Sequence, residues 1–227
     1  MRQSKPLTVL LAVLTAVALL TAAIAAPILC RPFYYAHIGP LDLCEQTGLT
    51  EEQIKTAYNE MLDYCLGAEE FSTGVLRWSE RGKSHFTDVR VLFLLDLKAL
   101  VISASLLIVT LVVSRLAGRR PGRLLGRGPA FWAGAGLGGA FLMVGGLAAL
   151  DFDKAFVVFH ALFFPGKDNW LFDPRTDEII TILPQEFFMN CALLILAILI
   201  VGCAALVAGD LILGSRRAEQ ENDAPLG

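Results

Sequence analysis

Two histidines, His85 and His160, are the side chains of this sequence best suited to proton transfer near neutral pH. The ordinary pKa of an imidazole is about 6.5, so a histidine can accept or donate a proton under physiological conditions. The two residues lie about 75 positions apart, and each falls just outside a long apolar stretch. If the chain folds so that both reach the same membrane boundary, the pair could perform acid–base chemistry on a lipid-linked substrate.

The stretch SHFTDVRVLFLLDLK places two carboxylates at helical spacing from His85. Asp88 and Asp96 lie three and eleven residues beyond it, so in a helix all three side chains share one face. Asp88 could orient the imidazole, although the helix dipole alone also favours an anion in the first turn. Asp96 lies deeper in the apolar stretch, where an ionisable group is costly unless it is paired or hydrated. We therefore expect Asp96 to serve a function, in substrate binding.

His160 is expected on a short aromatic helix. Four phenylalanines recur there at helical spacing, with His160 at the edge of their stripe: Phe152, Phe156, Phe159 and Phe163. The segment is too short to cross a membrane and ends at Pro165, so the pattern indicates an interfacial helix that holds the imidazole near the depth of lipid esters. The alternative is an ordinary surface histidine beside core phenylalanines. This segment taken alone favours that alternative.

Four apolar stretches are long enough to cross about 30 Å of hydrocarbon, which takes about 20 helical residues. They cover residues 7–29, 91–113, 129–150 and 191–213. With 55% hydrophobic and only 18% charged residues, the chain is too apolar for an ordinary soluble domain. We predict an all-α integral membrane protein, a four-transmembrane-helix bundle that forms a single membrane domain over residues 1–227. The first stretch has features of a signal peptide, but its length and the position of Pro27 favour an uncleaved anchor.

Positive charges predict the orientation of the bundle. Basic residues precede the first span, fill the loop between spans two and three (residues 114–128) and follow span four: Arg2, Lys5, Arg115, Arg119, Arg120, Arg123, Arg127, Arg216 and Arg217. Those segments are therefore expected to be cytoplasmic, and the two long polar segments, 30–90 and 151–190, extracytoplasmic. All three histidines lie in the extracytoplasmic segments. Because the arginines report orientation and the net charge is −3, nucleic acid is not an expected partner.

Local patterns predict an amphipathic helix and a close helix contact. Thr50 and Gln53 form a capping-box signature, and apolar residues then recur at helical spacing, which predicts a short amphipathic helix over residues 51–66. In the third span, Gly134 and Gly138 have the small-xxx-small spacing that lets two helices approach closely. A nucleotide-binding glycine loop is a poorer explanation, because it would need a preceding strand.

Cysteines and acidic residues give no clear metal-binding pattern. None of the cysteines has metal-ligand spacing, and a disulfide between Cys44 and Cys65 stays an open alternative. Asp168, Asp173 and Asp177 could be ligands of a cation, but their spacing does not match a calcium loop. Turn formation, and capping by Thr176 or Asp177 of a short helix ending near residue 183, explain them better. No metal site is predicted.

Three segments taken together resemble a known family. HFTDV opens the second span, FHALFFPGKDNWLFDPRTDEIITILPQEFF precedes the fourth, and GLTEEQIKTAYNEMLDY lies in the first polar segment. In this order and topology the chain resembles the bacterial lipoprotein intramolecular transacylases, from about residue 28 to about residue 213. The stretch from His160 through Trp170 to Asp173 and Pro174 is the most specific part of the resemblance.

The resemblance implies an acyl transfer within a diacylglyceryl-modified lipoprotein, at the extracytoplasmic face of the bacterial plasma membrane. The sn-2 acyl chain would move to the free α-amino group of the lipidated cysteine and give a lyso-form lipoprotein. The implied partners are the lipoprotein substrate and membrane lipid, and no cofactor is implied. Carried over by position, His85 and His160 are the expected catalytic pair and Asp88 the orienting carboxylate. Since amine and ester belong to one molecule, no acyl-enzyme is required.

Within that chemistry, we expect His85 to act as base toward the amine. His160 would donate a proton to the departing glycerol oxygen or to the oxyanion, although the two roles could be exchanged. The residues expected to line the entry of the acyl chain or to hold its loop, where packing is an equally good explanation, are Phe163, Phe164, Trp170 and Asp173.

Two other functions remain open on the sequence. A metal-dependent membrane hydrolase could use His85, His160 and a carboxylate such as Asp88 or Asp173 as ligands, although no HExxH signature supports it. A non-catalytic four-span scaffold would use the histidines only for hydrogen bonds within the loops.

Overall fold

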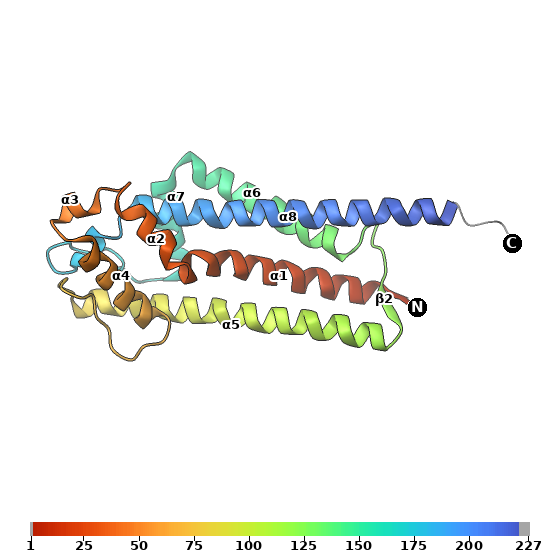
Figure 1. Ribbon diagram of the computed structural model, residues 1–227, viewed down its shortest axis with the longest axis horizontal. Helices are drawn as coiled ribbons and strands as arrows, with labels where there is room; N and C mark the ends of the chain where they lie inside the picture. The colour runs from red at the N-terminus through yellow and green to blue at the C-terminus, as the bar shows by residue number, and fades with distance from the viewer. Residues whose placement is uncertain (1, 223–227) are drawn as a thin grey trace. The chain divides into compact units, whose positions relative to one another are not determined.

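The chain forms long helices joined by shorter helices and loops (Figure 1). The computed structural model describes residues 2–222, and their side chains through residue 214. The side chains of Arg216 and Arg217, which entered the prediction of orientation, therefore lie outside the described residues. In chain order the elements are β1 (Arg2–Ser4), α1 (Lys5–Leu29), α2 (Arg31–Ile38), α3 (Leu43–Thr47), α4 (Glu51–Cys65), α5 (Glu80–Leu116), β2 (Arg119–Pro121), α6 (Pro129–Leu150), α7 (Phe152–Phe163), the 3₁₀ helix η1 (Glu178–Thr181) and α8 (Gln185–Asn222).

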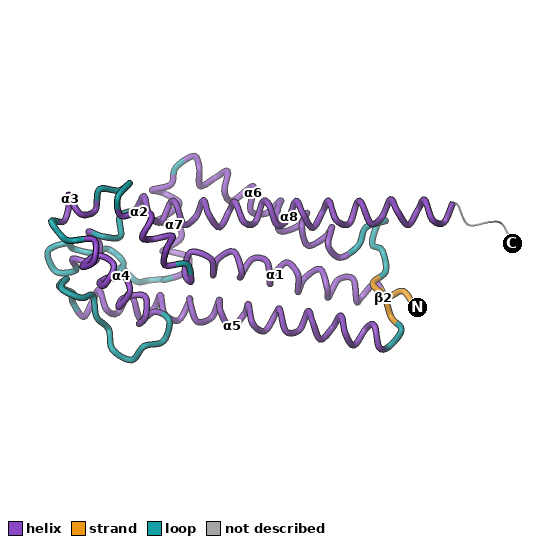
Figure 2. Tube along the Cα trace, in the orientation of Figure 1, coloured by secondary structure: helices purple, strands orange, loops and turns teal. Residues whose placement is uncertain are grey.

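Among the described residues, four helices contain an apolar stretch long enough to cross a membrane: α1, α5, α6 and the part of α8 from Gln185 to Gly214. The predicted all-α fold with four spans is therefore confirmed. Within the described residues, strand structure is confined to the short β1 and β2 (Figure 2).

Helix α5 begins well before its apolar stretch, at Glu80 rather than near residue 91. The Ser79 hydroxyl explains this early start, because it accepts a hydrogen bond from Gly82 N over 3.0 Å and so satisfies one of the unpaired amides of the first turn. His85 and Asp88 are therefore both helical residues of α5.

The chain divides into two compact units, and each span contributes to both. The first unit takes in the described parts of Met1–Ala23, Lys98–Gly146 and Leu196–Gly227. The second unit takes in Ile24–Leu97 and Leu147–Ile195. All three histidines and both predicted extracytoplasmic segments belong to the second unit.

In the first unit, the N-terminus pairs with the loop that follows α5. β1 and β2 form a parallel two-stranded sheet in which Arg2 pairs with Arg119. Thr8 strengthens this contact, because its hydroxyl donates to Gly122 O over 2.8 Å. The pairing was not predicted, since strands of three residues show no readable alternation. It places Arg2 and Arg119 together, as the predicted orientation requires, while the side of the membrane on which they lie stays a prediction.

Helices α6 and α8 approach closely at two glycines of the first unit. A Cβ atom at Gly134 would lie 2.6 Å from the backbone oxygen of Cys203, and one at Gly138 would lie 3.2 Å from the Cβ of Cys203. A larger side chain at Gly134 would therefore push the two helices apart. This contact confirms the close packing predicted from the glycine spacing, which in lipid is stabilised by dispersion between the backbones.

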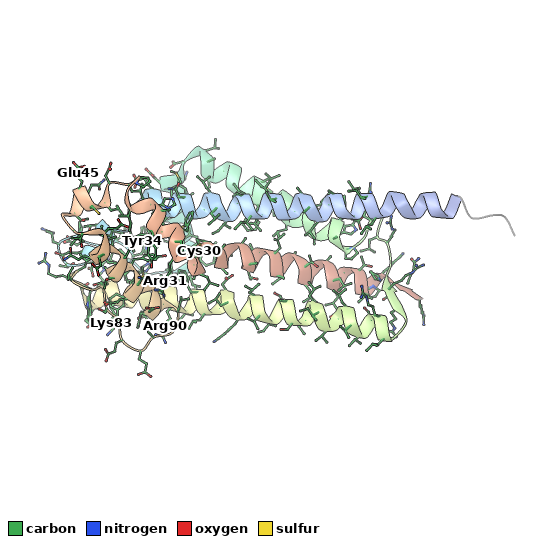
Figure 3. All side chains as sticks on the ribbon, in the orientation of Figure 1. Cys30, Arg31, Tyr34, Glu45, Lys83 and Arg90 are labelled. Carbon is green, nitrogen blue, oxygen red and sulfur yellow. The ribbon has the colours of Figure 1, made fainter. Side chains whose placement is uncertain are left out.

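An aromatic core in the second unit holds α2 against α4; Tyr34 of this core is labelled in Figure 3. The Tyr34 and Tyr58 rings stack with centroids 3.7 Å apart, and the Tyr34 hydroxyl donates to the backbone oxygen of Ile182 over 2.8 Å. Helix α4 confirms the predicted amphipathic helix, since Thr50 and Gln53 form the capping box. Its buried side is the predicted one: Ile54, Ala57, Tyr58, Met61, Leu62 and Cys65.

The short helices α2 and α3 were not predicted. They have eight and five residues, too few for a clear apolar period to emerge. Nearby, Cys44 is half-buried and Cys65 is buried, and both are free thiols. The disulfide that the sequence left open is therefore not formed in this structure.

Candidate active site

A buried carboxylate fixes the start of α5, which carries His85. Asp177 is only 4% exposed, and its Oδ1 accepts hydrogen bonds from Ser79 N over 2.8 Å and from Ser79 Oγ over 2.9 Å. Gly82 leaves room for this carboxylate, because a Cβ at Gly82 would lie 2.0 Å from Asp177 Oδ1. The sequence predicted that Asp177 or Thr176 caps the short helix that follows. Asp177 is the N-cap residue of η1 by position, but its side chain makes no capping hydrogen bond there and binds the start of α5 instead.

Helix α7 presents His160 in a defined orientation. Asp151 caps the helix by accepting a hydrogen bond from Lys154 N over 2.9 Å. His160 Nδ1 lies 2.8 Å from Phe156 O, one turn earlier. A backbone carbonyl only accepts hydrogen bonds, so Nδ1 carries the hydrogen and the neutral ring has its lone pair on Nε2. Burial lowers the pKa of His160 from the ordinary 6.5, partly opposed by the hydrogen bond to Phe156, so the ring is mainly neutral at pH 7.

The fold brings His85 and His160 together, as we expected from the sequence. Their ring centroids lie 5.9 Å apart at an interplanar angle of 32°. The two residues are nearly buried, at 6% and 7% exposed. Two imidazoles at this separation can contact one small polar group from two directions, which suits proton transfer to and from a single reacting centre. The third histidine, His37, lies on α2 with its ring 5.8 Å from that of Phe187.

Aromatic rings enclose the histidine pair. The Phe164 ring contacts both, with centroids 4.9 Å from His85 and 5.7 Å from His160. Trp170 stacks on His160 at 4.3 Å and 26°, and Phe172 meets His85 edge-on at 5.4 Å. Of the residues predicted to line the acyl entry, Phe164 and Trp170 are therefore part of this enclosure.

Three residues predicted to bind substrate or to hold its loop are found at other positions. Phe163 is 46% exposed on α7. Asp173 forms an ion pair with Arg175 over 2.8 Å, and hydrogen bonds from Arg175 lower the pKa of Asp173 to about 2. Asp96 lies eleven residues beyond His85 on α5, roughly 16 Å along the helix axis, and its Oδ2 is buried without a hydrogen bond from any described residue. Their predicted roles stay predictions.

The loop after α7 is tied to α5 through Asp88. In this loop, which we call the strap (residues 165–172), Lys167 Nζ lies 2.5 Å from Asp88 Oδ1 and Asn169 Nδ2 donates to Asp88 Oδ2 over 3.0 Å. Asp88 also interacts electrostatically with His85, but no hydrogen bond joins the two among the contacts of the described side chains. The direct orientation of His85 by Asp88 therefore stays a prediction.

Two buried polar atoms beside the pair lack hydrogen bonds. His85 Nδ1 and Asn169 Oδ1 are both shielded from solvent, and neither has a partner within the part of the chain that the structure describes. The Asn169 side chain nevertheless interacts with that of His85. Buried polar groups are nearly always paired, so these two atoms mark a place where a hydrogen bond is expected to form.

Lys167, Asn169 and Phe172 are site residues that sequence reasoning missed. The segment KDNWLF has neither a helical nor a strand period, and only the tertiary fold brings it to α5. Its one readable signal was the run of polar turn formers directly after Pro165, which marks a loop without saying what the loop covers.

A metal ion would find few ligands at this site. Among the side chains through residue 214, no group of three or more His, Cys, Asp or Glu residues is placed to hold a metal. Asp88, the carboxylate that a metal-dependent hydrolase would use beside the two histidines, is instead engaged by Lys167 and Asn169.

The chain matches one protein-family model and several solved structures. The family model "Lipoprotein intramolecular transacylase Lit" matches residues 9–188. An in meso structure of the membrane integral lipoprotein intramolecular transacylase Lit from Bacillus cereus has a TM-score of 0.81 and 23% identity, covering 94% of this chain and 97% of that one. A structure of the same Bacillus cereus protein with the mutation H85R, in its own numbering, has a TM-score of 0.77 and 22% identity, covering 95% of this chain and 93% of that one. A third structure, with the mutation H85A in the same numbering, has a TM-score of 0.76 and 21% identity, covering 96% of this chain and 95% of that one. A comparison with curated protein sequences finds no match.

Proposed function

Because the chain belongs to the lipoprotein intramolecular transacylase family, we propose that it moves the sn-2 acyl chain of a diacylglyceryl-modified lipoprotein to the α-amino group of the same lipidated cysteine. The product is an N-acylated, lyso-form lipoprotein. The observation that carries this proposal is the pair of buried imidazoles, His85 and His160, 5.9 Å apart in an aromatic enclosure. The reaction takes place at the extracytoplasmic face of the bacterial plasma membrane, where the predicted orientation puts both histidines.

The proposed reaction exchanges an ester bond for an amide bond. The amine nitrogen forms a bond to the ester carbonyl carbon, and the bond from that carbon to the sn-2 oxygen breaks. An α-amino group has an ordinary pKa of about 8, so it binds largely as an ammonium and must lose two protons, one before attack and one during it. The departing glycerol oxygen regains one proton, and the other leaves to water. Two histidines in one site suit these transfers.

Each histidine takes one of the two protons. His85 accepts the first from the ammonium, and the resulting imidazolium later donates to the glycerol oxygen. His160 accepts the second during attack, because its neutral ring keeps Nδ1–H on Phe156 O and its lone pair on Nε2. Burial and the neighbouring His160 lower the pKa of His85, so its imidazolium is short-lived, and the Asp88 carboxylate compensates the positive charge only in part. In this scheme His85 supplies the proton of the glycerol oxygen, a role that we expected from the sequence for His160, with the two roles left exchangeable.

No acyl-enzyme and no cofactor are needed for this scheme, because the nucleophile and the ester are parts of one molecule. The task of the enzyme is to fold the lipid headgroup so that the nitrogen approaches the carbonyl carbon. Phe164, Trp170 and Phe172 exclude water from the histidine pair, which favours attack by the amine over hydrolysis.

Substrate reaches the histidines after the strap moves, since Trp170 and Phe172 of the strap cover the two rings. The ion pair of Lys167 with Asp88 is half-exposed at the lysine, and such a surface pair contributes only about 0–1 kcal/mol, so releasing it costs little. Helix α7 exposes an apolar side that suits membrane lipid and the acyl chains of the substrate: Val157, Val158, Phe159, Leu162 and Phe163.

The proposal is tested with purified full-length protein and a synthetic diacylglyceryl-cysteine lipopeptide whose sn-2 chain carries deuterium. Intramolecular transfer leaves the total mass unchanged, so tandem mass spectrometry must locate the label on the N-terminal amide rather than on the glyceryl ester. Two peptides with different peptide and acyl labels, mixed together, should give no crossed products. Label that stays in the glyceryl ester after incubation with the wild-type protein contradicts the proposed function.

The same assay separates the two other functions. A membrane hydrolase would release the labelled chain as a free fatty acid and leave the α-amine free, and a metal-dependent one would stop when a chelator is added. A non-catalytic scaffold would leave the lipopeptide unchanged.

A further inference from the structure

Asn169 of the strap makes its side-chain hydrogen bonds with α5, the helix that carries His85. Its Nδ2 group donates to Asp88 Oδ2 over 3.0 Å and to Ser84 Oγ over 3.4 Å. An ionised carboxylate only accepts hydrogen bonds, so the amide is oriented with Nδ2 toward Asp88 and with Oδ1 on its other side. Both donor positions of the Asn169 amide are thus used on α5, and the Oδ1 acceptor is left over.

Asn169 Oδ1 and His85 Nδ1 are two buried atoms that can satisfy each other. Neither has a hydrogen-bond partner among the residues described, and both are shielded from solvent. One is an acceptor and the other can carry a hydrogen, and the two side chains already interact. Leaving both unpaired would cost the full desolvation penalty of each, and a hydrogen bond between them would remove both penalties. Hydrogen bonds of catalytic groups are often poorly aligned before substrate binds.

We infer that Asn169 is the positioning residue of His85: its Oδ1 accepts the Nδ1 hydrogen of the imidazole, while Asp88 holds the Nδ2 side of the amide. Asp88 then acts on His85 through the amide, and its own oxygens remain on Lys167 and Asn169. The catalytic meaning of this arrangement rests on the proposed function, because it assigns how a proton-transferring ring is held.

The pairing gives both catalytic rings the same tautomer. With Nδ1–H on Asn169 Oδ1, the neutral His85 ring has its lone pair on Nε2. His160 has the same arrangement, because its Nδ1 donates to Phe156 O. The charged or titratable groups that interact with His85 are Asp88 on the same helix, His160 on α7 and Lys167 in the strap. Both Nε2 atoms are therefore available for the ammonium and the ester of one substrate.

The tautomer of His85 is measured by ¹⁵N NMR of the full-length protein in detergent micelles, with its three histidines labelled. The wild-type protein should show His85 mainly with the hydrogen on Nδ1. Asn169→Leu removes the acceptor at similar size and should lower that fraction, while the control Ser84→Ala, which removes only the 3.4 Å contact behind the amide, should leave it unchanged. An unchanged tautomer in Asn169→Leu overturns the inference.

A second variant separates positioning from a merely structural role. Asn169→Asp keeps an oxygen acceptor but loses the donors to Asp88, just as Asn169→Leu does. If Asn169 acts by accepting from His85, the aspartate variant keeps the Nδ1–H form and the leucine variant loses it. If Asn169 only holds the strap on Asp88, the two variants behave alike, which also overturns the inference.

The kinetic readout ties the inference to catalysis. Asn169→Leu should lower kcat for the diacylglyceryl lipopeptide by about 10-fold or more, part of the roughly 10²–10⁴-fold contributed by acid–base groups, with KM nearly unchanged. A change in KM alone, with kcat unchanged, would count against positioning. Wild-type protein with the expected tautomer and no acyl transfer would refute the proposed function and leave the Asn169–His85 pairing intact, whereas acyl transfer with a different tautomer would refute only the pairing.

Discussion

Replacing Gly82 by alanine tests how the catalytic end of α5 is held. An alanine Cβ would lie 2.0 Å from Asp177 Oδ1, where ordinary contact begins at 3.4 Å, so the carboxylate would have to retreat by about 1.4 Å. That retreat breaks its hydrogen bonds from Ser79 N and Oγ, now 2.8 and 2.9 Å long. The same Cβ would press on Phe172, 3.2 Å away, whose ring covers His85.

The expected loss of stability in Gly82→Ala follows from these contacts. Each of the two lost hydrogen bonds to the buried Asp177 carboxylate contributes about 1.5–3 kcal/mol. Alanine in place of glycine within a helix stabilises the folded state by about 0.5–1 kcal/mol, which offsets part of this loss. The free energy of unfolding of Gly82→Ala should therefore fall by about 2–5 kcal/mol. In a protein of this size such a loss lowers Tm by at least about 4 °C.

Thermal unfolding of the full-length protein in detergent micelles measures this change. The matched control is Gly39→Ala in the same unit, because a Cβ at Gly39 meets nothing within 4 Å and the backbone there has a φ of −68°. Gly39→Ala should unfold at the wild-type temperature or slightly above it. Asp177→Ala should cost less stability in the Gly82→Ala background than in the wild type, because both changes remove the same contacts. Equal unfolding temperatures for Gly82→Ala and Gly39→Ala would refute the reasoning.

The other predictions concern His160 and the helix contact of the first unit. Because burial lowers the pKa of His160 from 6.5, the stability linked to its neutral ring is full above pH 6.5 and is lost as pH falls through the lower folded-state pKa. The unfolding temperature, measured from pH 8 to pH 4, should therefore fall more steeply below about pH 6.5 in the wild type than in His160→Gln. Parallel curves for the two proteins would contradict this. Trp170→Leu, which uncovers the His160 ring, should move the NMR-measured pKa of His160 upward, and a downward shift would be inconsistent with the stacked geometry. Gly134→Ala should destabilise the protein by about 1–3 kcal/mol through its clash with Cys203, whereas Gly136→Ala, with open space around it, should be neutral or stabilising; equal unfolding temperatures would argue against the contact of α6 with α8.

Periodicity and charge predicted the parts of the fold that depend on regular structure. The four spans follow from apolar length, helix α4 from its capping box and apolar spacing, and the contact at Gly134 from small-residue spacing. The positions of the arginines predicted that His85 and His160 lie in segments on the same side of the membrane, and the structure brings the two rings together. Where a pattern repeats over several turns, the sequence states which side of an element is buried.

Contacts made by irregular segments could not be predicted in this way. Helical spacing put Asp88 on the face of His85, but it could not show that Lys167 and Asn169 of a distant loop would occupy that carboxylate. Asp177 was expected to cap the nearest helix along the chain, whereas it binds Ser79 at the start of α5. These partners are determined by the tertiary fold, which a local pattern does not encode.

Single-turnover transfer of the labelled acyl chain by His85→Gln and His160→Gln tests the central claim most directly. The unfolding temperature of each variant is measured first and must equal that of the wild type, so that a lower rate reflects lost catalysis and not lost folding. The shared site predicts a fall of about 10²–10⁴-fold for each variant, with the double variant little slower than either one. Transfer at the wild-type rate by either folded variant would contradict the account.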